Sequence, residues 1–300
     1  MKYIAILFSA VLFVTNLEAQ TFKQQFNENF SKKDTAAQRR VLENWEKTDN
    51  NDAELYTAYF NYYVNKSRKN VLTLGSNPGS KESFQLVSKD TSSKEEIFLY
   101  EDMFYDPELL RKGFDYINVG IQKFPARLDM RFGKIHMLGK IENYEPFTNN
   151  IIETIHYSAK INNQWTWTDN KNVEDPKNFM LGSIQGYILQ LYDTEDDSLL
   201  DNMKRISEVV LIYYPDNIES LSDLSIVYLL QKDYDKALEV LLKAEKINPK
   251  DTIILNNIAQ AYKLKGDKKN SIKYYEAVMK YGDEEAKKFS QDQINKLKNK

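Results

Sequence analysis

Residues 215–248 read PDNIESLSDLSIVYLLQKDYDKALEVLLKAEKIN and residues 249–282 read PKDTIILNNIAQAYKLKGDKKNSIKYYEAVMKYG, so one pattern fills two consecutive segments of 34 residues. Proline opens both segments, at Pro215 and Pro249. The positions that recur after 34 residues are Leu221 and Leu255, Leu224 and Ile258, Tyr228 and Tyr262, Ala237 and Ser271, and Leu241 and Tyr275. A fixed period of this length is typical of repeat proteins in which each unit is one supersecondary element.

Each segment predicts two helices joined by a short turn. In the first segment, Leu221, Leu224 and Tyr228 lie three and four residues apart, which is the spacing of the buried face of a helix. A second stripe with this spacing begins at Ala237, and Pro249 ends it because proline cannot continue a helix. Each predicted helix pair leaves one apolar face that only a neighbouring pair can cover.

The pattern resembles the tetratricopeptide repeat (TPR), whose signature is W-x2-L-G-x2-Y, then A-x3-F, then P. The first copy reads Leu221-x2-Leu224-Ser225-x2-Tyr228, Ala237-x3-Leu241 and Pro249. The second copy reads Leu255-x2-Ile258-Ala259-x2-Tyr262 and Ser271-x3-Tyr275, with Asp283 at the place of the last proline. Ser271 and Asp283 depart from the signature, as is typical of a terminal repeat. The resemblance covers residues 215–283 and implies an all-α fold, a TPR-like right-handed superhelix of antiparallel helix pairs.

The N-terminus predicts a secretory signal peptide over residues 1–19. Met1-Lys2 gives a positively charged start, an apolar run extends from Ile4 to Val14, and the small residue Ala19 ends the segment. This run is too short to span a bilayer, which needs about 20 residues, and no later segment predicts a membrane span. The sequence contains no cysteine for lipid attachment or disulfides. We therefore expect a soluble, exported, periplasmic protein; the alternative is a buried N-terminal helix.

Between the signal peptide and the clear repeats, the pattern predicts two further helical regions. Residues 20–125 form an N-terminal helical region, with an inserted loop or hairpin at 66–93. Residues 126–214 form degenerate helical repeats, with an inserted loop at 162–176. Residues 215–300 contain the two clear TPR units and a C-terminal capping helix over 284–297.

The two insertions differ in character. In the first, residues 71–74 and 83–87 predict two short strands around a turn-rich loop, a small β-hairpin-like insertion. The second contains Trp165 and Trp167. Insertions in helical repeats map to loops on one face, often the binding face, so both tryptophans are candidate ligand-binding residues. The alternative is that they fold back over a helix pair.

No local pattern indicates catalysis. The two histidines, His136 and His156, lack the H-E-x-x-H spacing of a zinc site, and Gly75 to Lys81 has the wrong spacing for a phosphate-binding loop. A formal net charge of −3 gives no basic footprint for nucleic acid. We therefore predict that the protein is not an enzyme and has no cofactor, no metal site and no nucleic-acid partner.

The TPR resemblance implies a concave groove, lined by the first helices of successive repeats, that holds a peptide or a partner helix. It places seven residues toward this groove: Ser222, Ile226, Leu229, Asn256, Asn257, Gln260 and Lys263. The alternative is that they contact neighbouring helices. The sequence thus favours an exported protein-interaction module or scaffold for a protein or peptide partner. The other open reading is a small-molecule or glycan binder that uses Trp165 and Trp167.

Overall fold

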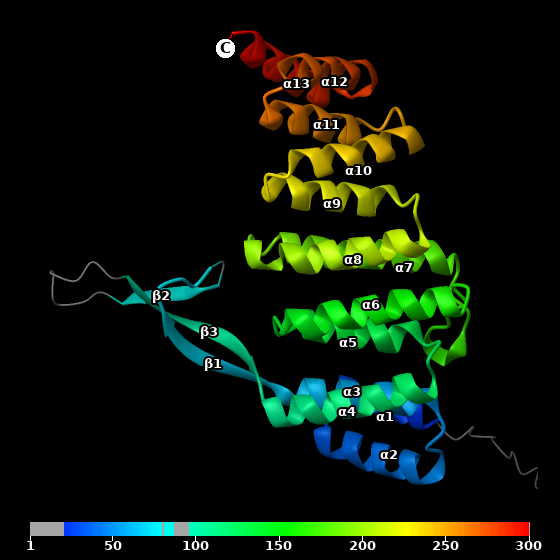
Figure 1. The fold of residues 1–300 in the computed structure, drawn as a ribbon. Coiled ribbons are helices and arrows are strands. Elements are labelled where there is room, and N and C mark those ends of the chain that lie inside the picture. Colours follow the sequence, from blue (N-terminus) through cyan, green and yellow to red (C-terminus); the bar gives the residue numbers. More distant parts are fainter. Residues whose placement is uncertain (1–20, 80, 87–95, 300) are drawn as a thin grey trace, which may run out of the picture. The chain divides into compact units, whose positions relative to one another are not determined.

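The computed structural model describes residues 21–79, 81–86 and 96–299. The predicted signal peptide lies outside the described residues. The chain is mainly helical (Figure 1) and divides into two compact units, Met1–Val119 and Gly120–Lys300, each considered by itself below. Within the described ranges, no helix is long and apolar enough to cross a membrane. The expected domain limits at residues 125 and 214 stay predictions.

The first unit begins with α1 (Phe22–Ser31), α2 (Thr35–Thr48) and α3 (Ala53–Ser67). Asp34 and Asp52 cap α2 and α3 by accepting hydrogen bonds from backbone N–H groups of the first turn. Helix α1 was not predicted; Thr21 opens it with a capping box. The core of these helices is aromatic and aliphatic: Phe26, Leu42, Trp45, Leu55, Ala58, Tyr59 and Tyr62.

Between α3 and the next helix lies a three-stranded sheet, here called the arm (residues 68–105). Its strands are β1 (Arg68–Gly75), β2 (Ser83–Leu86) and β3 (Ile97–Tyr105), in the order β1-β3-β2. Both β1 and β2 pair antiparallel with β3. The predicted β insertion is confirmed, but its two predicted strands do not pair with each other, because β3 lies between them.

The arm leaves and rejoins the helices at one point. The backbone N–H of Asp106 donates to the carbonyl oxygen of Ser67 at 2.8 Å, so the residues that flank the arm are neighbours. Helix α4 (Pro107–Lys123) follows directly. Its Tyr116 ring stacks on Tyr59 of α3, with ring centroids 3.9 Å apart. In Figure 1 the arm extends away from the ends of α3 and α4.

The second unit stacks helix pairs in chain order (Figure 1). The predicted degenerate repeats form α5 (Leu128–Lys140) with α6 (Tyr144–Lys160) and α7 (Pro176–Tyr192) with α8 (Leu200–Tyr213). Short 3-10 helices lie in two connections, η1 (Thr168–Asn170) and η2 (Asp197–Leu199). The clear repeats form α9 (Ile218–Leu230), α10 (Tyr234–Ile247), α11 (Thr252–Lys265) and α12 (Lys268–Tyr281), followed by α13 (Glu284–Lys298).

The two departures from the TPR signature have local explanations. Ser271 is fully buried at a position that requires a small residue, and its hydroxyl donates to the carbonyl oxygen of Ala259 at 2.9 Å. Asp283 stands where the signature has proline and caps α13 by accepting from the N–H of Ala286. One apolar core runs without interruption from Leu221 to Leu297. The all-α fold of helix pairs, with its small β insertion and C-terminal helix, is confirmed.

Candidate functional site

A pocket of about 410 Å³ opens beside the last helices of the second unit. Residues of α11, of the end of α12 and of the start of α13 line it. The lining residues are Thr252, Ile253, Asn256, Val278, Asp283, Glu285, Ala286 and Phe289. The pocket therefore lies on the last repeat and its capping helix.

The pocket combines exposed apolar surface with an unsatisfied polar atom. Ile253 and Phe289 are 68% and 47% exposed although both are large and apolar. The Oδ1 atom of Asn256 is buried and has no hydrogen-bond partner. A buried acceptor without a partner costs free energy, so a rotation of the Asn256 side chain that brought this oxygen to a ligand N–H or O–H would be favourable. The carboxylates of Asp283 and Glu285 line the same pocket and favour a ligand with positive charge.

Of the seven predicted groove residues, Asn256 lines this pocket. Two others on α11 are bonded to neighbouring helices. The Tyr275 hydroxyl donates to Oε1 of Gln260 at 3.1 Å, and Nζ of Lys263 donates to Oε1 of Gln293 on α13 at 2.9 Å. Asn257 is half-buried and is not among the residues that line the pocket. At Gln260 and Lys263, contact with neighbouring helices is what the structure shows.

The three predicted residues of α9 do not line this pocket either. Ser222 and Ile226 are half-buried, and Leu229 packs against the core of the repeats. Sequence reasoning missed Ile253 and Phe289. Ile253 precedes Asn256 by three residues, which places both on one face of α11, and this spacing was a signal that could have identified it.

The loop over residues 162–176 is a packing element. Trp165 is 1% exposed, and its indole N–H donates to Oγ of Ser158 at 2.9 Å. Trp167 is half-buried and packs edge-on against Phe179, with ring centroids 5.3 Å apart. Trp165 therefore offers no stacking surface, which corrects the expectation that it contacts a ligand. The tryptophans fold back onto helices, as the alternative reading has it.

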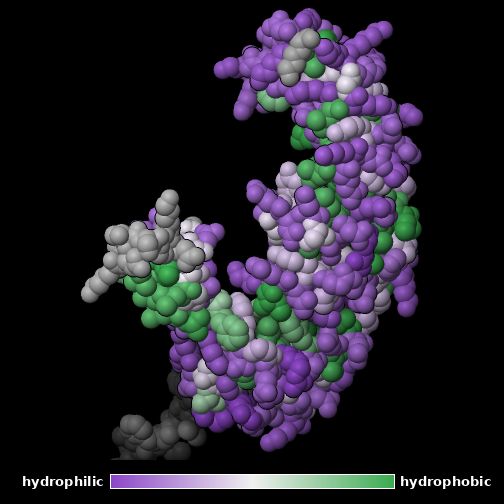
Figure 2. Space-filling view, turned by 60° about the vertical axis from the view of Figure 1, so that its left-hand side comes forward, coloured by the Kyte–Doolittle hydropathy of each residue, from purple (hydrophilic) through white to green (hydrophobic). Residues whose placement is uncertain are grey.

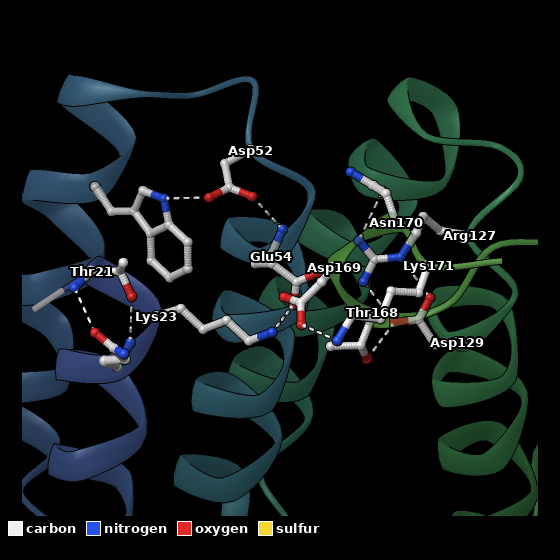
Figure 3. Close-up of polar contacts among 12 residues, drawn as sticks. Thr21, Lys23, Asp52, Glu54, Arg127, Asp129, Thr168, Asp169, Asn170 and Lys171 are labelled. Carbon is white, nitrogen blue, oxygen red and sulfur yellow. Dashed lines mark hydrogen bonds and ion pairs between the residues drawn. The ribbon is translucent and has the colours of Figure 1, made fainter.

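A buried ion pair anchors this loop (Figure 3). The guanidinium of Arg127, itself fully buried, makes two hydrogen bonds to the carboxylate of Asp129, at 2.8 and 2.7 Å. From the loop, Oδ1 of Asn170 accepts from Nη1 of Arg127 at 3.3 Å, and Oγ1 of Thr168 donates to Asp129 at 3.4 Å. Backbone bonds join Thr166 to residues on both sides of Arg127. The loop is thus fixed to the start of α5.

One buried carboxyl lies apart from the pocket. Asp223 on α9 is 3% exposed, and its Oδ1 accepts a hydrogen bond from Nε2 of Gln185 on α7 at 3.0 Å. Its Oδ2 has no partner. Burial raises the pKa of the Asp223 carboxyl to about 7, against the smaller opposing effect of the Gln185 bond. Among the described residues, no group of three or more His, Cys, Asp or Glu side chains is placed to hold a metal ion.

Comparison with known families identifies the repeats. A family model described as "TPR repeat" matches residues 227–266, and one described as "Tetratricopeptide repeat" matches residues 253–281. Comparison with curated protein sequences finds no match. The matched residues extend from α9 to the end of α12, the same helices that carry the 34-residue period.

Solved structures of TPR proteins are similar at low identity. YrrB, "a TPR protein with an unusual peptide-binding site", is 11% identical over 84% of this chain and 97% of its own, with a TM-score of 0.40. The C-terminal part of a TPR repeat-containing protein from Cytophaga hutchinsonii is 14% identical over 86% and 78%, with a TM-score of 0.42. A tetratricopeptide repeat protein from Parabacteroides merdae is 10% identical over 87% and 79%, with a TM-score of 0.34. TM-scores this low carry no argument, so the TPR assignment rests on the 34-residue repeats and on the two family models.

Proposed function

Because this chain is a tetratricopeptide repeat protein, we propose that it is a protein-interaction module whose pocket between α11, α12 and α13 binds a segment of a protein partner. The observation that carries this proposal is the pocket itself, in which exposed Ile253 and Phe289 flank an Asn256 acceptor that has no partner. This combination suits a peptide, which brings both apolar side chains and backbone N–H donors.

The size of each contribution follows from the exposed surface. Complete burial of a large apolar side chain contributes about 1.5–3 kcal/mol, so covering the exposed parts of Ile253 and Phe289 would contribute roughly 2–3 kcal/mol. A donor on Asn256 would add about 0.5–1.5 kcal/mol. The pocket alone therefore supports a weak interaction, and a tight partner would extend along α9 and α11, over Ser222, Ile226 and Asn257.

The module acts outside the cytoplasm in this proposal. Its support is the sequence of residues 1–19, with a positive start, an apolar run and a small residue at the expected cleavage site. Expression of the full chain in a Gram-negative host, followed by fractionation and N-terminal sequencing, tests this part. The expected product begins at Gln20 in the periplasmic fraction, and an unprocessed cytoplasmic chain would contradict export.

Site-specific photocrosslinking tests the pocket. A photoreactive phenylalanine analogue replaces Ile253 in the full chain, and the same analogue replaces Ile212 on α8 as the control, since the two isoleucines are 68% and 67% exposed. In living cells, position 253 should yield a discrete adduct that position 212 does not yield. Asn256→Ala and Phe289→Ser should reduce that adduct without changing the far-UV circular dichroism. Equal adducts at both positions, or none at position 253, would reject the pocket as a partner site.

A further inference from the structure

The arm carries one apolar face, and the strand register defines it. Residues directly opposite each other in antiparallel strands point to the same side of a sheet, and side chains alternate along each strand. Leu74 of β1 and Phe84 of β2 both lie opposite Leu99 of β3. Every second residue along each strand, starting from Leu74, Phe84 and Leu99, points to the same side of the sheet, here called the apolar face. Its exposed apolar residues are Leu72, Leu74, Phe84, Leu86, Ile97 and Met103.

These side chains are unusually exposed for their size. Leu72, Leu74 and Phe84 are 75%, 63% and 77% exposed, and the other three are exposed as well. Figure 2 shows hydrophobic residues gathered on the arm, whereas hydrophilic residues cover most of the remaining surface in that view. Single exposed apolar residues are common, but a contiguous group of six on one sheet face marks an interaction surface.

On the opposite face of the sheet, the Lys81 side chain lies over two residues of β3. Lys81 lies in the connection between β1 and β2, and its Nζ donates to Oδ1 of Asp102 at 2.8 Å. The same Nζ lies 5.2 Å from the centre of the Tyr100 ring. Asp102 and Tyr100 lie opposite Val71 and Thr73, so both belong to the face turned away from Leu72 and Leu74. Lys81 therefore lies over the face opposite Leu72 and Leu74, and not over the apolar face.

The surface suits a second copy of the same sheet. Two sheets pack face to face with their strands nearly aligned and their apolar side chains interdigitated. Taking roughly 150 Å² for a fully exposed large side chain, the exposed fractions of the six residues amount to about 500 Å², or about 1,000 Å² for two copies, the minimum expected of a specific interface.

Charge does not oppose this pairing. The apolar face bears one cation, Arg68, and one anion, Glu101, and the whole chain has a formal net charge of only −3. The segment 87–95 has the sequence VSKDTSSKE, in which Val87 is the one apolar residue. We propose that the apolar face of the arm is a homodimer interface, in which two copies pack their sheets face to face about a two-fold axis.

The absence of cysteine from the sequence makes a direct test possible. In the full mature chain, Leu74→Cys places a thiol within the proposed interface, and Val71→Cys places one on the opposite face. A flexible bis-maleimide crosslinker at micromolar protein concentration should convert L74C into a covalent dimer and leave V71C without a covalent link between copies. Equal crosslinking of the two variants, or none of L74C, would overturn the proposal.

Sedimentation equilibrium measures the same association without crosslinks. The double variant Leu72→Glu, Phe84→Glu should weaken dimerisation by more than about 100-fold, because each copy would bury two unpaired charges. Phe104→Glu is the matched control, since Phe104 is exposed on the opposite face. Circular dichroism should show that all three substitutions leave the helices intact. A wild-type chain that stays monomeric, or a double variant that dimerises like wild type, refutes the interface. Flotation of a monomer with phosphatidylethanolamine–phosphatidylglycerol vesicles, lost in the double variant, would assign the face to a lipid surface and also overturn the proposal.

Discussion

Replacement of Asp223 by asparagine should stabilise the protein in a manner that depends on pH. The side chain is buried on α9, one carboxyl oxygen accepts from Gln185, and the other has no partner. An asparagine has nearly the same shape, keeps an oxygen for Gln185 and never ionises. The substitution therefore removes the cost of a buried negative charge and leaves the contact between α7 and α9 in place.

The size of the effect follows from the pKa. The carboxyl has a pKa of about 7 when folded and 3.8 in its ordinary state, and at 1.36 kcal/mol per pH unit the difference corresponds to about 4 kcal/mol. Because the folded pKa is the higher one, the stabilising contribution of the protonated carboxyl is complete below pH 3.8 and is lost as the pH rises through 7. Between pH 5 and pH 8, D223N should therefore gain about 3 kcal/mol relative to wild type.

Urea unfolding followed by circular dichroism measures this gain at pH 5, 6, 7 and 8. Carboxylates that titrate in both proteins cancel in the difference between wild type and variant. Asp216→Asn is the control, because Asp216 is exposed just before α9 and its replacement changes the formal charge by the same amount. A difference between D223N and wild type that stays constant from pH 5 to pH 8 would refute the reasoning. So would an equal pH-dependent gain in D216N.

Three further predictions concern side-chain packing and are tested by measuring unfolding free energies. Arg127→Ala should destabilise the protein by about 3–5 kcal/mol because it leaves the buried Asp129 carboxylate without its ion-pair partner. Arg111→Ala, which breaks the exposed ion pair with Asp115, should cost less than about 1 kcal/mol. Similar losses in the two variants would contradict the role of burial. Gly182→Ala should stabilise by about 0.5–1 kcal/mol because, apart from its chain neighbours and the nearby backbone of its own helix, no atom lies within 4 Å of the new methyl group. Gly139→Ala should destabilise by about 1–3 kcal/mol because its Cβ would lie 2.8 Å from Phe147, and the reverse order of the two effects would contradict the packing. Trp165→Phe should destabilise by about 1 kcal/mol through loss of its bond to Ser158, and unchanged stability would show that this bond contributes little.

The sequence predicted the helices whose apolar pattern occurs twice, but not the elements whose pairing depends on residues distant in the chain. The helices of residues 218–281 follow from apolar positions that occur twice with helical spacing. Strand β3 was missed because its sequence, IFLYEDMFY, mixes apolar and acidic residues on both faces, and its register is set by partners on two sides. Helix α1 was missed because Phe22, Phe26 and Phe30 were not recognised as a helical stripe.

At the candidate site, too, one lining residue followed from the sequence and others did not. The TPR resemblance led to Asn256, which lines the pocket, but Gln260 and Lys263 on the same helix are bonded to neighbours. The accessibility of residues on α11 depends on the helix after the last repeat, and here α13 covers part of α11. Phe289 belongs to that covering helix, where exposure of an aromatic residue cannot be read from periodicity.

The hydrogen bond between Ser67 and Asp106 brings the end of α3 next to the start of α4, so the arm takes the place of the turn in a helix pair. Closure entropy grows only with the logarithm of loop length, so replacing a turn of about four residues by residues 68–105 costs roughly 2 kcal/mol. That is no more than the loss of one buried leucine side chain. A helical repeat protein can therefore acquire a whole β module at a turn, and the module can diverge in sequence while the helices around it stay as they are.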